Sequence, residues 1–285
     1  MSAYTSVPFS ELNASKVGRV VYLVLFEGDG PVAGIILGRW DDNAPYRSPF
    51  SAPFGGMDMA RKMRIEEVCE AYRLIREYCG ASGMHITLPP PQYAPAFVAQ
   101  HTYALDALAV RRELWLNHLY ELGPERPFES LVSEKMRQHL RRAWRSGYET
   151  DFNPSIEEAY EVIRQNRLER GYPLAMSLDD LKATASIIQQ EYIVLRHEGR
   201  AVAASISYRV APGVLQLIYW GHLSECRGKY PMVALADALY SHALAEGFDV
   251  LDLGPSTCVS SPNDSLADFK ESVGAQASLK FVFQL

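Results

Sequence analysis

Two segments of the chain share one pattern of apolar and polar residues. Residues 20–39 read VVYLVLFEGDGPVAGIILGR, and residues 190–210 read QEYIVLRHEGRAVAASISYRV. Each holds an apolar strand, a Glu-Gly turn, the pair Val-Ala and a second strand with an Arg at its end, which predicts a β-hairpin. Tyr22 corresponds to Tyr192, an offset of 192 − 22 = 170 positions. The chain is therefore expected to contain one structural unit twice.

The likeness continues beyond the hairpins. Each is followed by a polar stretch with Pro and Gly, then by a helix, a Gly and a strand. The helix and strand are IEEVCEAYRLIREYCGASG and MHITL in the first half, and VALADALYSHALAEG and FDVLDL in the second. Gly83 and Gly247 lie 247 − 83 = 164 positions apart, so the offset is nearly kept. We expect two α/β domains, residues 1–128 and 129–285, and the seam between such domains commonly binds a ligand.

The elements of the first half follow from hydrophobic periodicity and turn residues. The predicted elements are strands over 19–27, 31–39, 84–88 and 102–108, helices over 62–79 and 111–121, and a loop over 40–60. Long loops inside a compact domain are often functional, and this one is rich in Pro and Gly. Within it, Arg47 is open as a residue that binds an acceptor, whereas Phe50 and Phe54 are expected to plug the core.

The second half is predicted to run strand, helix, helix, three strands, helix, strand, helix, strand. Ser155 and Glu158 match a capping box at the start of a helix that ends at Gly171. Its buried stripe is expected to consist of Ile156, Tyr160, Ile163 and Arg167/Leu168. The other elements are helices over 131–146, 178–189 and 231–246, and strands over 148–152, 191–197, 201–210, 213–221, 248–253 and 276–284. This order predicts a mixed sheet flanked by helices, in the α/β (α+β) class.

Five segments carry a resemblance to a known family. They are YRSPFSAPFGGM at 46–57, MRQHLRRAWRSGYETDF at 136–152, NRLERGYP at 166–173, GFDVLDLGPS at 247–256 and SLADFKESVGAQ at 265–276. With the order of elements, they resemble the GNAT acyltransferase fold, and within it the Fem-type peptidoglycan aminoacyltransferases with tandem GNAT-like domains. The resemblance covers most of the chain. It implies that an amine nitrogen attacks an ester or thioester carbonyl, in a site that orients two substrates, stabilises an oxyanion and accepts a proton.

Arg227, Gly228 and Lys229 lie in a loop before a predicted helix that starts with Pro231. Backbone N–H groups and two cations in such a loop suit the diphosphate of an acyl-CoA. The acyl-CoA loop of GNAT enzymes has Arg or Gln, two residues, Gly, one residue, then Gly or Ala. The stretch 225–230 keeps only the central Gly, so a solvated turn explains it equally well.

Three residues are candidates for the chemistry. Lys270 matches the Phe-Lys position of the Fem-type group, which implies contact with a charged part of the substrate or with the reacting carbonyl. Tyr219 and His222 lie on and just after the predicted strand 213–221, and can donate or accept a proton. Each also fits a structural role: Lys270 on a helix surface, Tyr219 in the core and His222 at a strand end.

The segment GPSTC at 254–258 has only a superficial likeness to a nucleophile elbow. The GxSxG pattern fails at Cys258, so hydrolase chemistry is not expected. The Ser-rich residues that follow, up to Asn263, are predicted to form a loop over the site.

Composition narrows the classes of function. A chain of 285 residues is long enough for two domains, and 48% hydrophobic with 22% charged residues is typical of a soluble globular protein. No apolar run approaches the ~20 residues that span a bilayer, and the N-terminus lacks a secretory pattern. The four cysteines form no CxxC pair, which argues against a zinc site or a disulfide framework. We expect a cytoplasmic protein without a metal.

The net charge of the chain bears on which carrier donates the acyl group. A net charge of −6 argues against general binding of nucleic acid, and the basic run KMRQHLRRAWR at 135–145 is explained as a cationic helix end. The expected donor is an acyl-CoA or an aminoacyl-tRNA, and the expected acceptor is a small amine or a cell-envelope precursor. A heptad arm that would favour tRNA is missing. A non-catalytic ligand-binding protein that kept the GNAT fold is the alternative, and a nucleic-acid-binding module ranks third.

Overall fold

The computed structural model describes residues 2–123, 126–258 and 261–285. They form two compact units, each with its own hydrophobic core. Unit 1 comprises Met1–Asn117, Thr257–Ser261 and Ser278–Leu285, and unit 2 comprises His118–Ser256 and Pro262–Ala277. The sequence predicted a boundary between two domains after residue 128. The division into compact units does not test whether each domain folds by itself, so this boundary stays a prediction.

Unit 1 is built on a sheet with strand order β1-β2-β3-β5-β14, with β4 beside β2. Its elements are η1 (Ala3–Thr5), α1 (Val7–Leu12), η2 (Ala14–Lys16), β1 (Arg19–Glu27), β2 (Gly30–Arg39), β3 (Tyr46–Ser48), β4 (Asp58–Met59), α2 (Ile65–Cys79), η3 (Gly80–Ser82), β5 (Met84–Thr87), η4 (Pro91–Tyr93), α3 (Pro95–Asp106) and β6 (Arg111–Glu121), with residues 118–121 of β6 in unit 2.

The helix α2 forms where the periodicity predicts it. Val68, Tyr72 and Ile75 recur on one helical face and are buried. Acidic residues in the first turn complement the helix dipole. Gly80, with φ of 56°, takes a backbone conformation that ends the helix.

Two predictions for the first half are wrong. The segment 102–108 is not a strand: residues 102–106 lie in the helix α3 and residues 107–108 form a turn after it. Pro95 begins the helix, and Val98, His101 and Leu105 are buried on one face. The segment 111–121 is the strand β6 and not a helix. Its residues 117–120 are all buried, as in a strand covered on both faces, and sheet pairing overrides a composition rich in charged residues.

The predicted loop 40–60 contains the short strands β3 and β4. Phe54 is buried in it and its ring meets that of Tyr4 edge to face, which confirms the prediction that this aromatic fills the core. The guanidinium of Arg47 lies 4.9 Å from the ring centre of Trp40. An acceptor-binding role for Arg47 stays a prediction.

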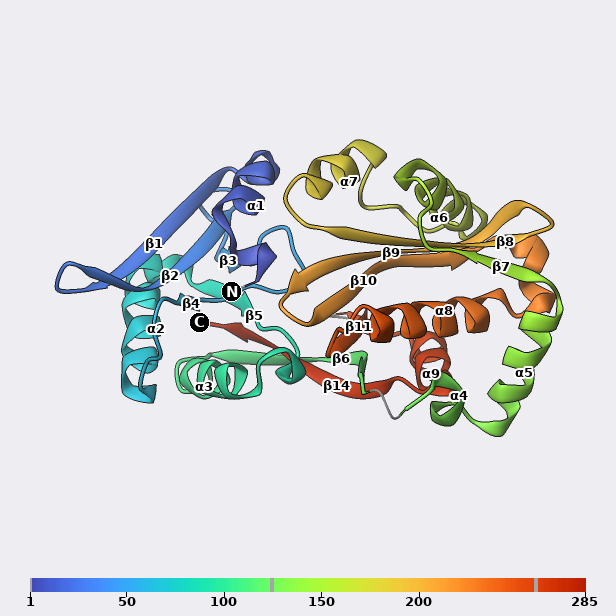
Figure 1. The fold of residues 1–285 in the computed structure, drawn as a ribbon. Coiled ribbons are helices and arrows are strands. Elements are labelled where there is room, and N and C mark those ends of the chain that lie inside the picture. The colour runs from blue at the N-terminus through green and yellow to red at the C-terminus, as the bar shows by residue number, and fades with distance from the viewer. Residues whose placement is uncertain (1, 124–125, 259–260) are drawn as a thin grey trace. The chain divides into compact units, whose positions relative to one another are not determined.

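Unit 2 is built on a sheet with strand order β11-β10-β9-β8-β7. Helices α6 and α7 lie on one face of this sheet and α8 lies on the other (Figure 1). The remaining elements along the chain are α4 (Phe128–Leu131), α5 (Glu134–Arg145), β7 (Tyr148–Asp151), α6 (Ile156–Arg170), α7 (Leu178–Ala185), β8 (Gln190–His197), β9 (Arg200–Ala211), β10 (Val214–His222), η5 (Ser224–Lys229), α8 (Pro231–Ala245), β11 (Val250–Pro255), β12 (Thr257–Cys258), β13 (Ser261–Pro262), α9 (Asp264–Ser272) and β14 (Gln276–Gln284). Of these, β12, Ser261 and residues 278–284 of β14 belong to unit 1.

The order from β7 to β14 is the predicted one, with the two short strands β12 and β13 in addition. In α6, the side chain of Ser155 accepts the N–H of Glu158, and Gly171 ends the helix in a left-handed conformation, as predicted. The predicted loop up to Asn263 includes residues 259–260, which lie outside the described residues.

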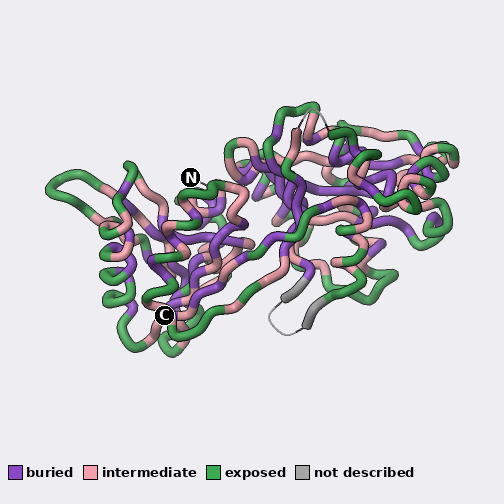
Figure 2. Tube along the Cα trace, turned by 90° about the horizontal axis from the view of Figure 1, so that it is seen from below, coloured by how far each residue is buried: buried purple, intermediate pink, exposed green. Residues whose placement is uncertain are grey.

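The internal repeat is visible in the strand pairing. Tyr22 pairs with Ile36 in the hairpin of β1 and β2, and Tyr192 pairs with Ile206 in the hairpin of β8 and β9. The offset is 170 for both pairs (192 − 22 and 206 − 36). Figure 2 shows buried residues gathered inside each unit and exposed residues along its outside. The duplicated hairpin read from the sequence is confirmed in its register.

Candidate functional site

The strands β10 and β11 of unit 2 run side by side over only part of their length. They pair in parallel at Val214–Gln216 and Val250–Asp252, although both strands continue beyond this point. At the last paired position, the side-chain amide of Gln216 donates to a carboxylate oxygen of Asp252 at 2.9 Å. Beyond this position, β10 and β11 are no longer paired with each other.

A bulge in β10 begins at the same place. The register against β9 shifts between Leu217 and Tyr219, so Ile218 is an extra residue in the ladder. A bulge bends its strand and leaves the extra residue without a regular partner. The bend and the end of pairing with β11 fall within three residues of each other.

A cavity of about 280 Å³ lies along the end of β10. Its walls come from the end of α6, the end of β10, the start of α8 and the segment that begins α9. The lining residues are Asn166, Arg167, Arg170, Tyr172, Trp220, Gly221, Met232, Asn263, Ser265, Leu266 and Phe269. All of them belong to unit 2.

The charge of this cavity comes from Arg167 and Arg170. Neither forms an ion pair with a described residue, and no Asp or Glu is among the described lining residues. The Nε atom of Arg167 is buried without a hydrogen-bond partner in the described structure, and its guanidinium lies 5.8 Å from the ring centre of Tyr219. Guanidinium groups bind carboxylate and phosphate with paired hydrogen bonds, so this wall suits an anionic group.

The apolar part of the cavity lining comes mainly from aromatic residues. The rings of Trp220 and Phe269 lie 5.6 Å apart between centres, and Tyr172 and Leu266 also line the cavity. A cavity with an apolar side and a few polar groups suits a ligand with an apolar body and a charged end.

Tyr219 and His222 flank the two residues of β10 that line the cavity, Trp220 and Gly221. Burial raises the pKa of the Tyr219 hydroxyl, so this group stays neutral. Burial, and then the positive charge of Arg170, lowers the pKa of the His222 imidazole. His222 is therefore neutral at neutral pH, and its Nδ1 atom has no hydrogen-bond partner within the described residues. Neither side chain lines the cavity itself.

Lys270 lies on α9, next to the cavity residue Phe269. Its side chain is 1% exposed, and its ammonium donates to the backbone oxygens of Gly254 at 2.8 Å and Pro255 at 3.2 Å. These bonds tie α9 to the end of β11. The structure thus shows Lys270 as a group that holds a turn, and its predicted contact with substrate stays a prediction.

The same turn carries a chain of hydrogen bonds that sequence reasoning missed. The hydroxyl of Ser256 lies 2.9 Å from Nδ1 of His118, and Nε2 of His118 donates to the carboxylate of Glu271 at 3.3 Å. Burial lowers the pKa of His118. Ser256 is buried and is not among the cavity residues, so this Ser-His-Glu chain links β6 and α9 to the bend that follows β11.

The predicted phosphate loop lies apart from the cavity lining. Arg227, Gly228 and Lys229 are exposed in η5, and Nζ of Lys229 donates to Nε2 of His197 at 3.0 Å. The backbone N–H of Ser224 in this loop is already bonded to the Glu169 carboxylate. A role of the three residues in binding a donor stays a prediction.

The fold of this chain is similar to that of several solved structures. The chain aligns with the crystal structure of FemX at a TM-score of 0.66, over 99% of this chain and 92% of that one, with 9% identity. The chain shares the fold of FemX. The structure of L-PGS from Bacillus licheniformis has this fold too (TM-score 0.60, 99% and 92% covered, 11% identity). So does a domain assigned as the C-terminal part of a lysylphosphatidylglycerol synthetase from Agrobacterium fabrum (TM-score 0.60, 92% and 83% covered, 12% identity).

The Fem-type fold confirms the predicted fold class of a mixed α/β sheet with two GNAT-like halves. No protein-family model matches the sequence, and no curated protein matches it significantly. Likeness at these identities establishes the fold alone. Within the described residues, no helix is long and apolar enough to cross a membrane, and no three His, Cys, Asp or Glu side chains are grouped to hold a metal ion.

Arg167 and Arg170 were not among the residues predicted for the site. The motif NRLERGYP places them three residues apart at the end of a helix, which is a signal for one shared face. The sequence reading assigned Arg167 and Leu168 only to the buried stripe of α6. Arg167 is partly buried, but the assignment of Leu168 is wrong: Leu168 is exposed, whereas Val162, Ile163 and Asn166 are buried.

Proposed function

We propose that this protein transfers an acyl or aminoacyl group from an activated carrier, a CoA thioester or an aminoacyl-tRNA, to an amine acceptor. The observation that carries the proposal is the unit 2 cavity, where Arg167 and Arg170 face an aromatic wall. Both carriers bear phosphates, and so does the lipid named in the lysylphosphatidylglycerol synthetase that shares the fold. The two guanidinium groups bind the anionic part of one substrate.

The reaction needs a donor for the oxyanion and an acceptor for a proton. The amine nitrogen attacks the carbonyl carbon, a C–N bond forms, and the carbonyl oxygen becomes an oxyanion. In this proposal the backbone of the β10 bulge at Ile218 supplies the donor for the oxyanion, because a bulge leaves its extra residue outside the regular ladder. The bond to the carrier sulfur or oxygen then breaks. The amine proton passes to the neutral imidazole of His222 and on to the leaving atom.

The remaining candidates take supporting roles in this proposal. Tyr219, beside Arg167, donates a hydrogen bond from its neutral hydroxyl. Lys270 acts through the turn at Gly254, which positions α9 and its Phe269 side chain at the cavity. Arg227 and Lys229 bind the diphosphate when the carrier is a CoA thioester.

Ligand-dependent thermal unfolding tests the proposal. Acyl-CoAs and aminoacyl-tRNA are added in turn, and a ligand at about 100 times its Kd stabilises the folded protein by about 2.7 kcal/mol, a shift of several degrees in Tm. The variant Arg167→Ala/Arg170→Ala is expected to lose the shift. Arg164→Ala is the matched control, because Arg164 lies on the same helix, exposed and paired with Glu161. No shift with either class of carrier contradicts the proposal.

A non-catalytic binding protein is the second candidate. It is favoured by one observation, that none of Lys270, Tyr219 and His222 lines the cavity. Release of free CoA thiol, or of deacylated tRNA, in the presence of amines separates the two. A carrier that shifts Tm but is never consumed with any amine supports binding alone.

A further inference from the structure

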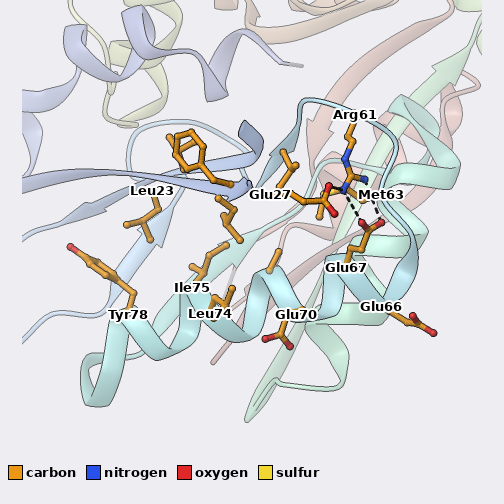
Figure 3. Close-up of a pocket in the computed structure, with 15 residues that line it drawn as sticks. Leu23, Glu27, Arg61, Met63, Glu66, Glu67, Glu70, Leu74, Ile75 and Tyr78 are labelled. Atoms are coloured by element: carbon orange, nitrogen blue, oxygen red, sulfur yellow. Dashed lines mark hydrogen bonds and ion pairs between the residues drawn. The ribbon is translucent and has the colours of Figure 1, made fainter. Parts of the chain in front are cut away.

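The strand β1 is the free edge of the unit 1 sheet, since it pairs only with β2 among the described residues. A groove of about 620 Å³ runs between this edge and α2 (Figure 3). Leu23 and Leu25 of β1 and Ile75 of α2 line it, and Leu74 and Tyr78 of α2 are exposed at its margin. The groove is therefore an apolar surface beside a strand whose backbone groups lack a neighbouring strand.

The repeat shows what covers the same place in unit 2. At the offset of 164, Leu74 corresponds to Ala238 of α8; Leu74 is 48% exposed and Ala238 is 5% exposed. At the offset of 170, Leu25 corresponds to Leu195, which pairs with Thr150 of β7 and is fully buried. In unit 2, β7 extends the sheet and α5 packs on α8. Unit 1 has no counterpart of either element within its described residues.

Other apolar side chains of β1 are exposed as well. Val24 and Phe26, which also belong to the groove lining, alternate with Leu23 and Leu25 along the strand and are 53% and 63% exposed. In unit 2, α6 contacts the equivalent strand β8 and Val194, the counterpart of Val24, is buried. An edge strand with exposed apolar side chains is a template for pairing with another strand.

The sequence of β1 is complementary to itself when reversed. Antiparallel pairing of two copies centred on Leu23 places residues i and 46 − i opposite each other. Arg19 then faces the partner's Glu27, Val21 faces the partner's Leu25, and Tyr22 faces the partner's Val24. Opposite charges and apolar pairs at facing positions stabilise an antiparallel ladder. Any pairing shifted by one residue separates the two charged ends and moves apolar side chains to the wrong face.

The position of α2 is consistent with a dimer axis at Leu23. Arg61 bonds Glu27 and Glu67, so one end of α2 lies beside the end of β1. The four residues back to Leu23 span about 13 Å, the rise of about nine helical residues. That length leads from Glu67 to the region of Leu74 and Tyr78, which lies beside Leu23, with Glu66 at the far end (Figure 3). The apolar part of α2 is thus at the centre, and its acidic part is away from it.

We propose that this protein forms a symmetric dimer in which β1 of each copy pairs antiparallel with β1 of the other. The two-fold axis passes at Leu23. Leu74 and Tyr78 of both copies fill the two grooves over the joined sheet, taking the place that α5 and β7 occupy in unit 2. Arg19 of each copy pairs with the partner's Glu27 at the two ends of the ladder.

Sedimentation velocity of the full chain, from about 1 to 500 μM, tests the dimer in the affinity range of moderate complexes. Arg19→Glu creates two like-charge pairs across the ladder and is expected to raise the dimer Kd about tenfold. Glu27→Arg does the same and also breaks the ion pair of Glu27 with Arg61 within each copy. The double variant Arg19→Glu/Glu27→Arg restores the two pairs across the ladder and is expected to lower the dimer Kd well below that of either single variant. Arg145→Glu, an exposed charge reversal in unit 2, is the control. Circular dichroism confirms that each variant is folded.

A disulfide test reports the register directly. Leu23→Cys is expected to cross-link to itself under mild oxidation, because the same residue of both copies meets at the axis. Leu114→Cys, on the exposed part of β6, is expected not to cross-link. A monomer at all concentrations, a dimer that neither charge reversal weakens, or a double variant that does not recover overturns the proposal.

Discussion

Asn166 on α6 is bonded to His222 at the end of β10: the side-chain amide of Asn166 donates to the backbone oxygen of His222 at 2.7 Å. Both residues are buried. The bond joins the helix that carries Arg167 and Arg170 to the strand that carries Trp220, and it thereby sets the width of the cavity. A buried carbonyl left without its donor costs about 1–3 kcal/mol.

The first prediction is that Gly221→Ala disturbs this joint. An added Cβ at Gly221 would lie 2.5 Å from Oδ1 of Asn166, so the amide must move and its bond to His222 is strained. We expect a loss of about 1–3 kcal/mol in the free energy of unfolding and weaker ligand binding in the cavity. Urea unfolding and the ligand-induced shift in Tm measure the two effects.

Gly228→Ala is the matched control for this substitution. No heavy atom lies within 4 Å of a Cβ added at Gly228. Its free energy of unfolding is expected to stay within about 0.5 kcal/mol of the original. An unchanged stability in Gly221→Ala would mean that the Asn166 side chain swings away at no cost, and that the bond to His222 does not set the cavity width.

The parts of the fold that were predictable have local signals. The hairpins have turn residues between apolar strands, and α2 and α6 have caps and periodicity. The helix α3 was missed because residues 102–108 were interpreted as an alternating strand pattern, and the apolar residues of this region do not form a clear helical periodicity. Pro95 nevertheless marks the start of the helix. The strand β6 was missed because the charged start RRE favours a helix in isolation. Pairing within the sheet decides its structure, and one sequence does not contain that information.

The site was less predictable than the fold. Lys270 was selected for its position in a motif, but burial and two backbone carbonyls determine what its ammonium does. In the sequence, Arg170 looks like the charged, solvent-facing end of a helix, and Arg167 was assigned to the buried stripe of α6 with no role in the site. Only the packing of α6 against β10 turns them toward a cavity with no acidic lining residue among those described.

The second prediction concerns Lys270. Lys270→Met keeps most of the side-chain volume but removes the donor of two buried hydrogen bonds, so we expect a loss of about 2 kcal/mol in the free energy of unfolding. The exposed Lys62 gives the control Lys62→Met, expected to change stability by less than about 0.5 kcal/mol. Chemical unfolding at neutral pH measures both.

The same variant separates a positioning role from a catalytic one. If Lys270 acts through the turn, transfer activity falls through a higher KM as the cavity wall loosens. A large loss of kcat with an unchanged free energy of unfolding would show direct participation of the ammonium in the reaction.

The third prediction is the pH dependence of transfer. Burial lowers the pKa of His222, so its imidazole is the neutral base at and above neutral pH, and kcat/KM is expected to stay independent of this group there. The rate falls only at a pH below ~6.5, the ordinary pKa of His, as the ring takes up a proton. His222→Gln is expected to lower the rate about 10²–10⁴-fold and to remove this acidic limb. An unchanged acidic limb in His222→Gln assigns the base elsewhere.

The last prediction concerns stability and rests on His101 in unit 1. This ring is fully buried on α3, its Nδ1 atom lies 2.6 Å from the hydroxyl of Tyr72, and burial lowers its pKa to about 4. Between pH ~6.5, the ordinary His value, and about 4, the unfolded chain binds a proton at this position and the folded protein does not. The free energy of unfolding therefore falls as the pH falls through this window, by about 3 kcal/mol from this residue.

Urea unfolding at several pH values, for the original protein and for His101→Gln, isolates the contribution of His101: the variant should lose less stability on acidification. Tyr72→Phe should keep the full slope, because burial and not the hydroxyl depresses the pKa; equal slopes for all three proteins would show that His101 is protonated in the folded state.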